Sequence, residues 1–145
     1  MQKVINQNKR EIKVSDVMLA PKNIPVVNEH EMVRETLEKM NLFKLGICCI
    51  TDSENKLLGI ITDGDFRRIL LSEQKPLGAL FVDDILDHSS RNFISINPEK
   101  TIIEAVEIMG ECKIWDLPVV NSQNILLGLL HLHPAIKKMI EKIND

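Results

Sequence analysis

The segment LLGIIT, residues 57–62, returns as LLGLLH at residues 126–131, so its position number increases by 69. NEHEMVRETLEKM, residues 28–40, matches NPEKTIIEAVEIM, residues 97–109, at the same offset and without a gap. Self-similarity at a fixed spacing indicates a repeated structural unit. The sequence therefore predicts two homologous halves, each too small to bury a core alone, that pack together.

Two further matches have slightly different offsets, as a diverged duplication with changes in its loops would show. GICCIT (46–51) matches DLPVVN (116–121) at an offset of 70, and VSDVM (14–18) matches VDDIL (82–86) at an offset of 68. The predicted organisation is an N-terminal extension at 1–13, a first repeat at 14–73, a linker at 74–81 and a second repeat at 82–143.

Each repeat has the predicted order β-α-β-β-α. Asn28 and Asn97 suit the N-cap of the first helix of each repeat, and Pro98 suits its first helical position. The paired strands are apolar throughout, which is typical of a sheet covered on both faces. The predicted strands are 24–27, 46–51, 57–62, 93–96, 116–121 and 125–130, and the closing helices are roughly 64–72 and 134–143.

This order predicts a mixed α/β (α+β) fold in which the two repeats pack with pseudo-twofold symmetry. Clefts at such a seam are concave and bounded on both sides, so we expect a ligand to bind there.

The composition limits other functions. A net charge of -3 leaves no basic excess for a nucleic-acid backbone, and no apolar run approaches the roughly 20 residues that span a bilayer. The first residues are polar and of mixed charge, so we expect no signal peptide and a cytoplasmic location. Cys48, Cys49 and Cys112 lie in apolar runs and form a poor disulfide framework, so we expect buried thiols.

The stretch GIITDGDFRRIL, residues 59–70, places polar side chains where a strand ends and a helix begins. The first N–H groups of a helix lack helical partners and attract anions such as phosphate. Thr62 and Asp65 suit the hydroxyl groups of a ribose, and Gly64 permits close approach of a ligand. Arg68 suits a phosphate.

The same residues also have a purely structural interpretation. Thr62 or Asp63 can cap the helix, Asp65 can interact with the helix dipole, and the arginines can be solvated. The ligand interpretation gains from the position of the motif in a duplicated unit that borders a cleft.

Taken together, VSDVM, LLGIITDGDF and DLPVVNSQNILLGLL resemble three features of tandem CBS domains, the Bateman module: the lead segment, the G-h-h-T-x-x-D turn and the h-P-V-V strand. The resemblance covers about residues 14 to 143. GIITDGDFRRIL with LLGLLHLHPAI is similar, more specifically, to the C-terminal CBS pair of KpsF/KdsD-type arabinose-5-phosphate isomerases. The second repeat of that family ends in G-h-L-H-h-H-D-L, where this chain has Pro134 in place of the Asp.

The resemblance implies a regulatory module that binds a nucleotide between its repeats and forms a homodimer. In that family the isomerase reaction belongs to a separate sugar-isomerase (SIS) domain. This chain has no room for such a domain, so we expect that the chain by itself is not an enzyme. The implied partner is the SIS domain of an isomerase that makes a precursor of Kdo, a sugar of lipopolysaccharide. Neither nucleic acid nor membrane is an expected partner.

By position, the resemblance assigns the ribose to Thr62 and Asp65, and it places backbone of the first repeat beside the base. In the second repeat His131 and Pro134 replace the usual Thr and Asp, so we expect one competent site or two unlike sites. The residues predicted to bind nucleotide, from the junction and the resemblance together, are Thr62, Gly64, Asp65, Arg68, Ile24, Ile47, Cys48, Pro118, His131 and His133.

Three other groups of residues suggest other roles. His131 and His133 share a strand face but lack a third metal ligand at a typical spacing, so we expect no metal. A catalytic pair of Cys48 and His131 lacks an orienting third group. Trp115 either packs half-buried or stacks on a ligand or a dimer partner.

We therefore predict a nucleotide sensor for sugar-phosphate metabolism, with no cofactor. Its regulatory ligand is a cytidine nucleotide such as CMP or CMP-Kdo, or an adenine nucleotide such as AMP or ATP. Two alternatives stay open: a structural dimerisation module without ligand, and the CBS pair of a sugar-nucleotidyltransferase.

Overall fold

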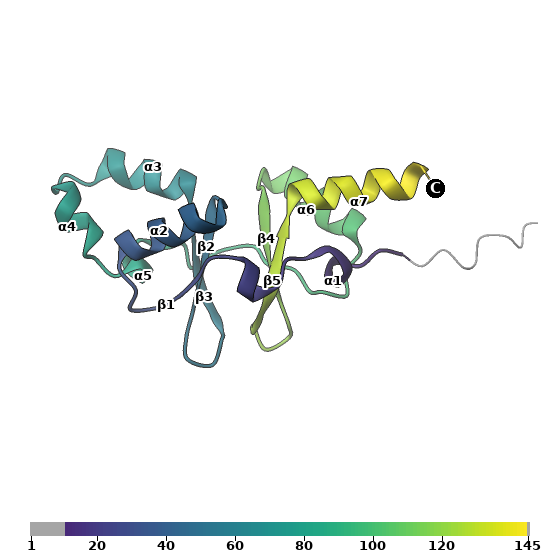
Figure 1. Ribbon diagram of the computed structural model, residues 1–145, viewed down its shortest axis with the longest axis horizontal. Coiled ribbons are helices and arrows are strands. Elements are labelled where there is room, and N and C mark those ends of the chain that lie inside the picture. Colours follow the sequence, from purple (N-terminus) through teal and green to yellow (C-terminus); the bar gives the residue numbers. More distant parts are fainter. Residues whose placement is uncertain (1–10, 145) are drawn as a thin grey trace, which may run out of the picture.

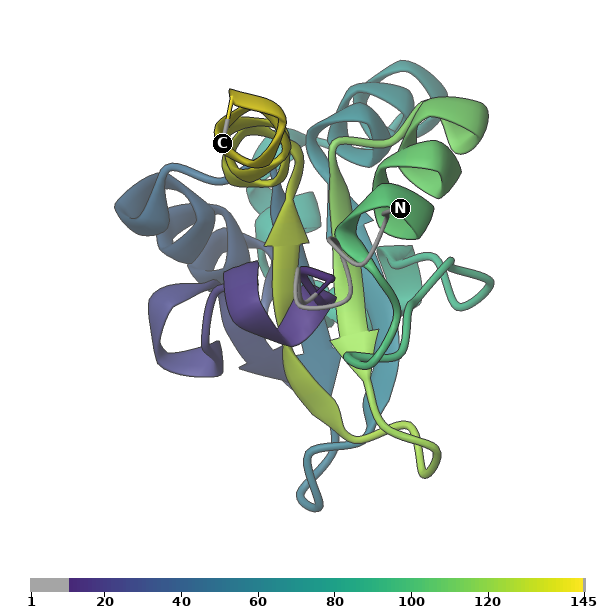
Figure 2. The same ribbon diagram turned by 90° about the vertical axis from the view of Figure 1, so that its right-hand side faces the viewer.

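The computed structural model describes residues 11–144, so residues 1–10 of the predicted N-terminal extension lie outside the described residues. Two halves of the same build lie side by side, with their strands at the centre (Figure 1), and one hairpin lies behind the other in the turned view (Figure 2). The predicted mixed fold of two repeats is confirmed.

The first half contains β1 (Val26–Asn28), α2 (Val33–Phe43), β2 (Ile47–Thr51), β3 (Leu57–Thr62) and α3 (Asp63–Ser72). The second contains α6 (Ile102–Cys112), β4 (Asp116–Val120), β5 (Leu126–His131) and α7 (Leu132–Asn144). The connecting elements are α1 (Val14–Val17), η1 (Pro21–Asn23), α4 (Leu77–Phe81) and α5 (Ile85–His88).

The two hairpins are equivalent at a single offset of 69 throughout. Ile47 pairs with Thr62 in the first hairpin, and Asp116 pairs with His131 in the second. The offset of 70 predicted for 46–51 with 116–121 is therefore wrong by one position. Only the backbone register reveals the error, because apolar runs align about equally well in either position.

The segments that precede each half, residues 12–19 and 83–90, are here called the lead segments. Their hydrogen bonds are equivalent at an offset of 71, whereas the sequence predicted 68. Val14 N donates to Lys100 O at 2.8 Å, as Ile85 N donates to Glu31 O at 2.8 Å. Ile102 N donates to Ile12 O at 2.9 Å, as Val33 N donates to Asp83 O at 2.9 Å.

Each lead segment packs on the opposite half of the molecule. Val14 is fully buried in the core of the second half, together with Ile102 and Leu117, whereas Ile85 is fully buried in the core of the first half, beside Val33 and Ile61. Burying one such side chain contributes about 1.5–3 kcal/mol. The exchange therefore ties the halves together through both of their cores.

Residues 93–96 of the second half form no strand equivalent to β1. The sequence predicts this strand at 93–96, but only Ile96 makes an isolated parallel bridge, to Val119. In the first half, Cys49 N donates to Pro25 O at 3.0 Å and extends the β1–β2 ladder. The residue equivalent to Cys49 is Pro118, which has no N–H to donate, so the ladder cannot extend.

Asn28 and Asn97 are not the N-caps that the sequence predicts for the first helix of each repeat. Asn28 and Asn97 accept hydrogen bonds from the backbone N–H two residues later, at 2.8 Å each, and form turns that precede the helices. The helices begin at Val33 and Ile102, whose N–H groups are bonded to the opposite lead segment. Pro98 accordingly lies before α6, whose N-cap is Thr101.

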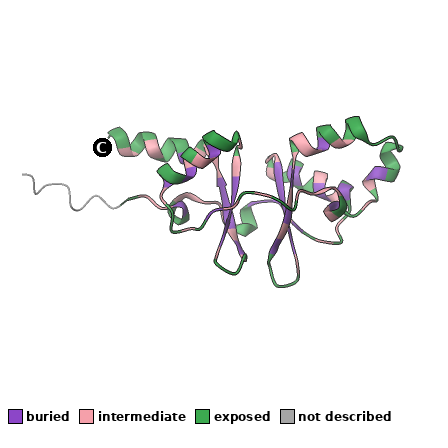
Figure 3. Ribbon diagram, turned by 180° about the vertical axis from the view of Figure 1, so that it is seen from behind, coloured by how far each residue is buried: buried purple, intermediate pink, exposed green. Residues whose placement is uncertain are grey.

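Burial is concentrated at the centre of the molecule (Figure 3). All five residues of β2 are buried, as expected for a strand covered on both faces. A third core cluster joins the two sheets and contains Ile47 and Cys49 from one half with Leu126 and Leu129 from the other. Within residues 74–81, the predicted linker, α4 buries Leu80 against the first half.

We expect Gly128→Ala to destabilise the protein by about 1–3 kcal/mol, the usual scale of overpacking. A Cβ at Gly128 would lie 2.5 Å from Leu19 O, a backbone atom of the opposite lead segment that cannot move aside cheaply. Urea unfolding measures the effect. Gly110→Ala is the control, because nothing lies within 4 Å of a Cβ there and alanine favours a helix. Equal stability of Gly128→Ala and the parent protein would contradict the close-packed crossing.

Candidate functional site

A cleft of about 720 Å³ lies at the seam between the halves. Five separate stretches of chain line it: the start of β2, the β3–α3 junction, the segment between α5 and α6, the α6–β4 connection and the end of β5. The lining residues are Gly46, Ile47, Ile60, Thr62, Asp63, Gly64, Asp65, Arg67, Arg68, Ser90, Asn92, Phe93, Ile94, Lys113, Ile114, Trp115, Asp116 and His131.

Thr62 and Asp65 form a reciprocal capping box at the start of α3. Asp65 N donates to Thr62 Oγ1 at 3.2 Å, and Thr62 N donates to Asp65 Oδ2 at 2.9 Å. The Thr62 hydroxyl also donates to Asp65 Oδ2, at 3.1 Å. The prediction that Thr62 can cap the helix is therefore confirmed, and Thr62 and Asp65 both lie on the cleft wall.

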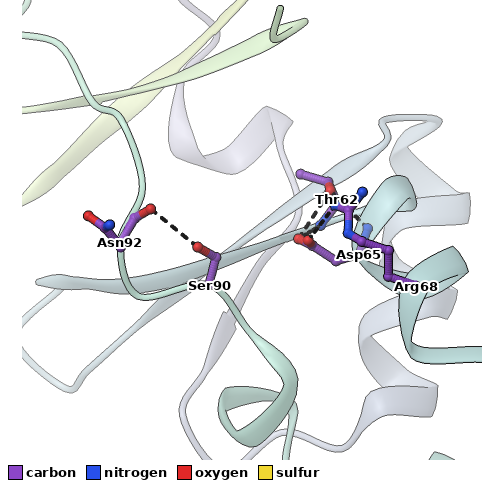
Figure 4. A network of polar contacts seen from close by, with 5 residues as sticks. All are labelled: Thr62, Asp65, Arg68, Ser90 and Asn92. Atoms are coloured by element: carbon purple, nitrogen blue, oxygen red, sulfur yellow. Dashed lines mark hydrogen bonds and ion pairs between the residues drawn. The ribbon is translucent and has the colours of Figure 1, made fainter. Parts of the chain in front are cut away.

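Arg68 lies over the first turn of α3. Its Nη2 donates to Asp65 Oδ1 at 2.9 Å, in a pair whose arginine is 64% exposed. A Cβ at Gly64 would lie only 3.2 Å from the same Nη2, so glycine lets the guanidinium approach the helix start. Figure 4 shows Thr62, Asp65 and Arg68 grouped at this junction, with Ser90 and Asn92 on the neighbouring segment.

That neighbouring segment is held against β3 by the backbone. Ile60 N donates to Ser90 O at 3.0 Å, and Ser90 N donates to Ile60 O at 2.8 Å. Phe93 and Ile94 follow in the lining and add apolar surface beside Ile60. This side of the cleft suits a flat apolar group such as a nucleobase.

The second half contributes a polar pair to the opposite wall. His131 Nδ1 lies 2.7 Å from Asp116 Oδ1, and the side chains are 30% and 10% exposed. Burial raises the pKa of the Asp116 carboxyl, while the hydrogen bond and the charge of His131 lower it and the charge of Asp63 raises it. A positively charged neighbour therefore stabilises the ionised form of the Asp116 carboxyl.

Trp115 is 71% exposed on the same wall. This exposure contradicts half-buried packing within one chain, and stacking on a ligand or on a dimer partner stays a prediction.

The structure brings six of the ten predicted site residues to the cleft: Thr62, Gly64, Asp65, Arg68, Ile47 and His131. The other four do not line it. Ile24 and Cys48 are buried in core clusters, Pro118 is buried within β4, and His133 is exposed in the first turn of α7. Nucleotide contacts by these ten residues stay a prediction.

Sequence reasoning missed the two segments that complete the cleft. Ser90 and Asn92 approach β3 only because the lead segments exchange, which no local pattern indicates. The Asp116–His131 pair had a usable signal, since the register of an antiparallel hairpin places these residues opposite each other. The one-residue misalignment of the repeats concealed it.

The cysteines do not gather into a reactive site. Cys48 and Cys49 lie in different core clusters, as expected for neighbours on opposite faces of a strand. Burial raises the pKa of Cys48 to about 12 and also raises the pKa of Cys49. Cys112 is exposed, so the expectation that all three thiols are buried is wrong.

Among residues 11–144, no group of three or more potential ligands could hold a metal ion. Across the same range, every helix is too short or too polar to cross a membrane.

Comparison with protein families matches the chain twice to the CBS domain, over residues 14–72 and 82–133. The arabinose 5-phosphate isomerase KdsD of Salmonella typhimurium is 30% identical over 128 residues, which are 87% of this chain and 37% of that protein. The chain thus spans little more than a third of the curated relatives that it matches.

Solved structures have the same fold at low identity. CBSX2, crystallised in complex with AMP, is 21% identical with a TM-score of 0.79, covering 91% of this chain and 98% of that one; CBSX2 is from Arabidopsis thaliana. The CBS domain pair of MJ0100, in complex with 5′-methylthioadenosine and S-adenosyl-L-methionine, is 19% identical with a TM-score of 0.76, covering 92% and 99%.

We expect a thiol reagent such as Ellman's reagent to modify one of the three cysteines, Cys112, rapidly at about pH 8. Thiolate is the reactive form, Cys112 is exposed, and burial raises the pKa of both Cys48 and Cys49. Denaturant should release the other two. Cys112→Ser should abolish the rapid reaction, and rapid modification that persists in this variant would show that Cys48 or Cys49 is accessible.

Proposed function

The chain belongs to the CBS domain family, and from this premise we propose that it is a regulatory pair that binds a nucleotide in the cleft beside Thr62 and Asp65. The observation that carries the proposal is the position of these two residues on a cleft that both halves line. A ligand there contacts both halves at once. Its binding therefore favours one arrangement of the halves, or of the dimer, and biases an attached enzyme.

Ribose recognition uses the spare capacity of the capping box. A carboxylate accepts about four hydrogen bonds, and the bonds of Asp65 come from Thr62 N, Thr62 Oγ1 and Arg68 Nη2. A ribose hydroxyl donates to the remaining capacity of Asp65 or displaces Arg68, which is mostly exposed and easily moved. Because the capping box holds Asp65 in place, the site is preorganised.

The base and the phosphate then occupy opposite ends of the cleft. The base lies on the apolar surface of Ile47, Ile60 and Phe93. The phosphate lies near the start of α3, where Gly64 and Arg68 offer a backbone approach and a cation.

Two ligand classes have support from relatives. The adenine ligands named for CBSX2 and MJ0100 favour AMP, ATP or another adenosyl compound. The similarity to KdsD favours a cytidine compound such as CMP or CMP-Kdo, as feedback on a sugar-phosphate isomerase of lipopolysaccharide precursor synthesis. The regulated partner is then an SIS catalytic domain in the same protein or in another one, and the pair assembles as a homodimer in the cytoplasm.

A structural role is the second candidate, because the second half has His131 and Pro134 in place of the usual Thr and Asp. In that case the pair dimerises and holds its partner without any ligand. A thermal-shift panel of adenine, cytidine, guanine and uridine nucleotides at about millimolar concentration separates the candidates, since a ligand that binds only the folded state raises the melting temperature. We expect at least one nucleotide to do so; no shift with any of them supports the structural role.

We expect Asp65→Ala to weaken nucleotide binding by about 1.5–3 kcal/mol, the scale of a hydrogen bond to a charged group. Isothermal titration calorimetry measures the change. The control is Glu104→Ala, because Glu104 completes the same kind of capping box with Thr101 at the start of α6, away from the cleft. Both variants lose a helix cap, so a loss of affinity confined to Asp65→Ala isolates the ligand contact. Unchanged affinity in Asp65→Ala refutes the ribose assignment.

A further inference from the structure

His131 occupies the position in the second hairpin that Thr62 occupies in the first. Thr62 pairs with Ile47, and His131 pairs with Asp116, at equivalent points of the two ladders. Both residues nevertheless line the same cleft. The residue equivalent to Asp65 is Pro134, which offers no side-chain acceptor. His131 thus cannot take part in a second ribose contact of the Thr62–Asp65 kind.

The His131 ring is held by a carboxylate that is only 10% exposed. Its hydrogen bond to Asp116 Oδ1, at 2.7 Å, uses Nδ1, so Nε2 is the nitrogen that can serve a ligand. Asp116 fixes the ring orientation, as an acid behind a functional histidine generally does. The protonated ring donates from Nε2, whereas a neutral ring with its proton on Nδ1 accepts there.

The charge of the cleft depends on this ring. The lining contains three acidic and three basic side chains, whose formal charges sum to zero. The net charge of the lining is therefore zero when His131 is neutral and +1 when His131 is protonated. Asp63, Asp65, Arg67 and Arg68 face the cleft from the β3–α3 junction, and Lys113 and Asp116 from the α6–β4 connection. On α7, which continues from His131, His133 lies outside the lining.

Building on the nucleotide site proposed above, we propose that His131 determines the selection of phosphorylated ligands in this cleft, by donating from Nε2 of its imidazolium to the ligand phosphate while Asp116 holds Nδ1. Phosphate oxygens are strong acceptors, and a charged donor roughly doubles the strength of the bond. The ribose contact of Thr62 and Asp65 identifies a nucleoside. His131 then separates the nucleotide from the nucleoside, and it does so more strongly as the pH falls.

His131→Asn tests this inference with the folded contacts preserved. The asparagine amide N–H takes the place of Nδ1–H toward Asp116, whereas Nε2 is lost. Calorimetry compares CMP with cytidine and AMP with adenosine at about pH 6 and about pH 8, the range over which histidines change charge. The titration of the ligand phosphate is common to both proteins, so it cancels in the ratio of their dissociation constants.

We expect His131→Asn to weaken nucleotide binding about tenfold at the lower pH, the effect of losing one charge-assisted hydrogen bond, and to have little effect at the higher pH. Nucleoside affinity should be the same in both proteins at both pH values. His30→Asn is the matched control, because His30 is exposed and lies outside the lining, and it should behave as the parent protein.

An equal loss for nucleotide and nucleoside, or a ratio that does not change with pH, overturns the role of His131 while nucleotide binding itself stands. If neither nucleotide binds the parent protein, the proposed sensor function fails, and this inference fails with it.

Discussion

The structure depends on the exchange of lead segments between the two halves. Val14 and Ile85 are both fully buried. Val14 precedes the first half in the sequence but lies in the core of the second half, and Ile85 precedes the second half but lies in the core of the first half. The same segments bond the first N–H groups of α2 and α6, and so decide where those helices begin. The second lead segment ends at Ser90, whose backbone pairs with β3. This pairing places the segment between α5 and α6 on the cleft. The core and the candidate site therefore have one common cause.

Duplication gives the two halves one backbone plan but unlike chemistry at equivalent points. The hairpins agree in length and register, yet Thr62 faces Ile47 where His131 faces Asp116. Asp65 completes a capping box, whereas Pro134 has no acceptor to complete one. The cleft therefore has one wall suited to hydroxyl groups and another that carries an ionisable pair.

The T-x-x-D motif shows that a structural role and a binding role can belong to the same atoms. Thr62 and Asp65 stabilise the start of α3, and a helix cap of this kind contributes about 1 kcal/mol. The same hydrogen bonds hold the carboxylate on the wall of the cleft in a single orientation. A ligand that uses Asp65 therefore loses little entropy in ordering it. Capping alone is not evidence against binding.

The sequence by itself determined the duplication, the order of elements in each half, the apolar hairpins and the β3–α3 junction, because these follow from local periodicity and from a repeat that survives divergence. It could not determine the exact register of the repeats, the starts of α2 and α6, or the loss of the strand at 93–96 opposite Pro118. Tertiary structure decided these, along with the pairing of Asp116 with His131 and the arrival of Ser90 at the cleft. The physical reason is that buried N–H groups must find partners. Here the partners lie on the opposite half of the molecule, far away in the sequence, where no local pattern reaches.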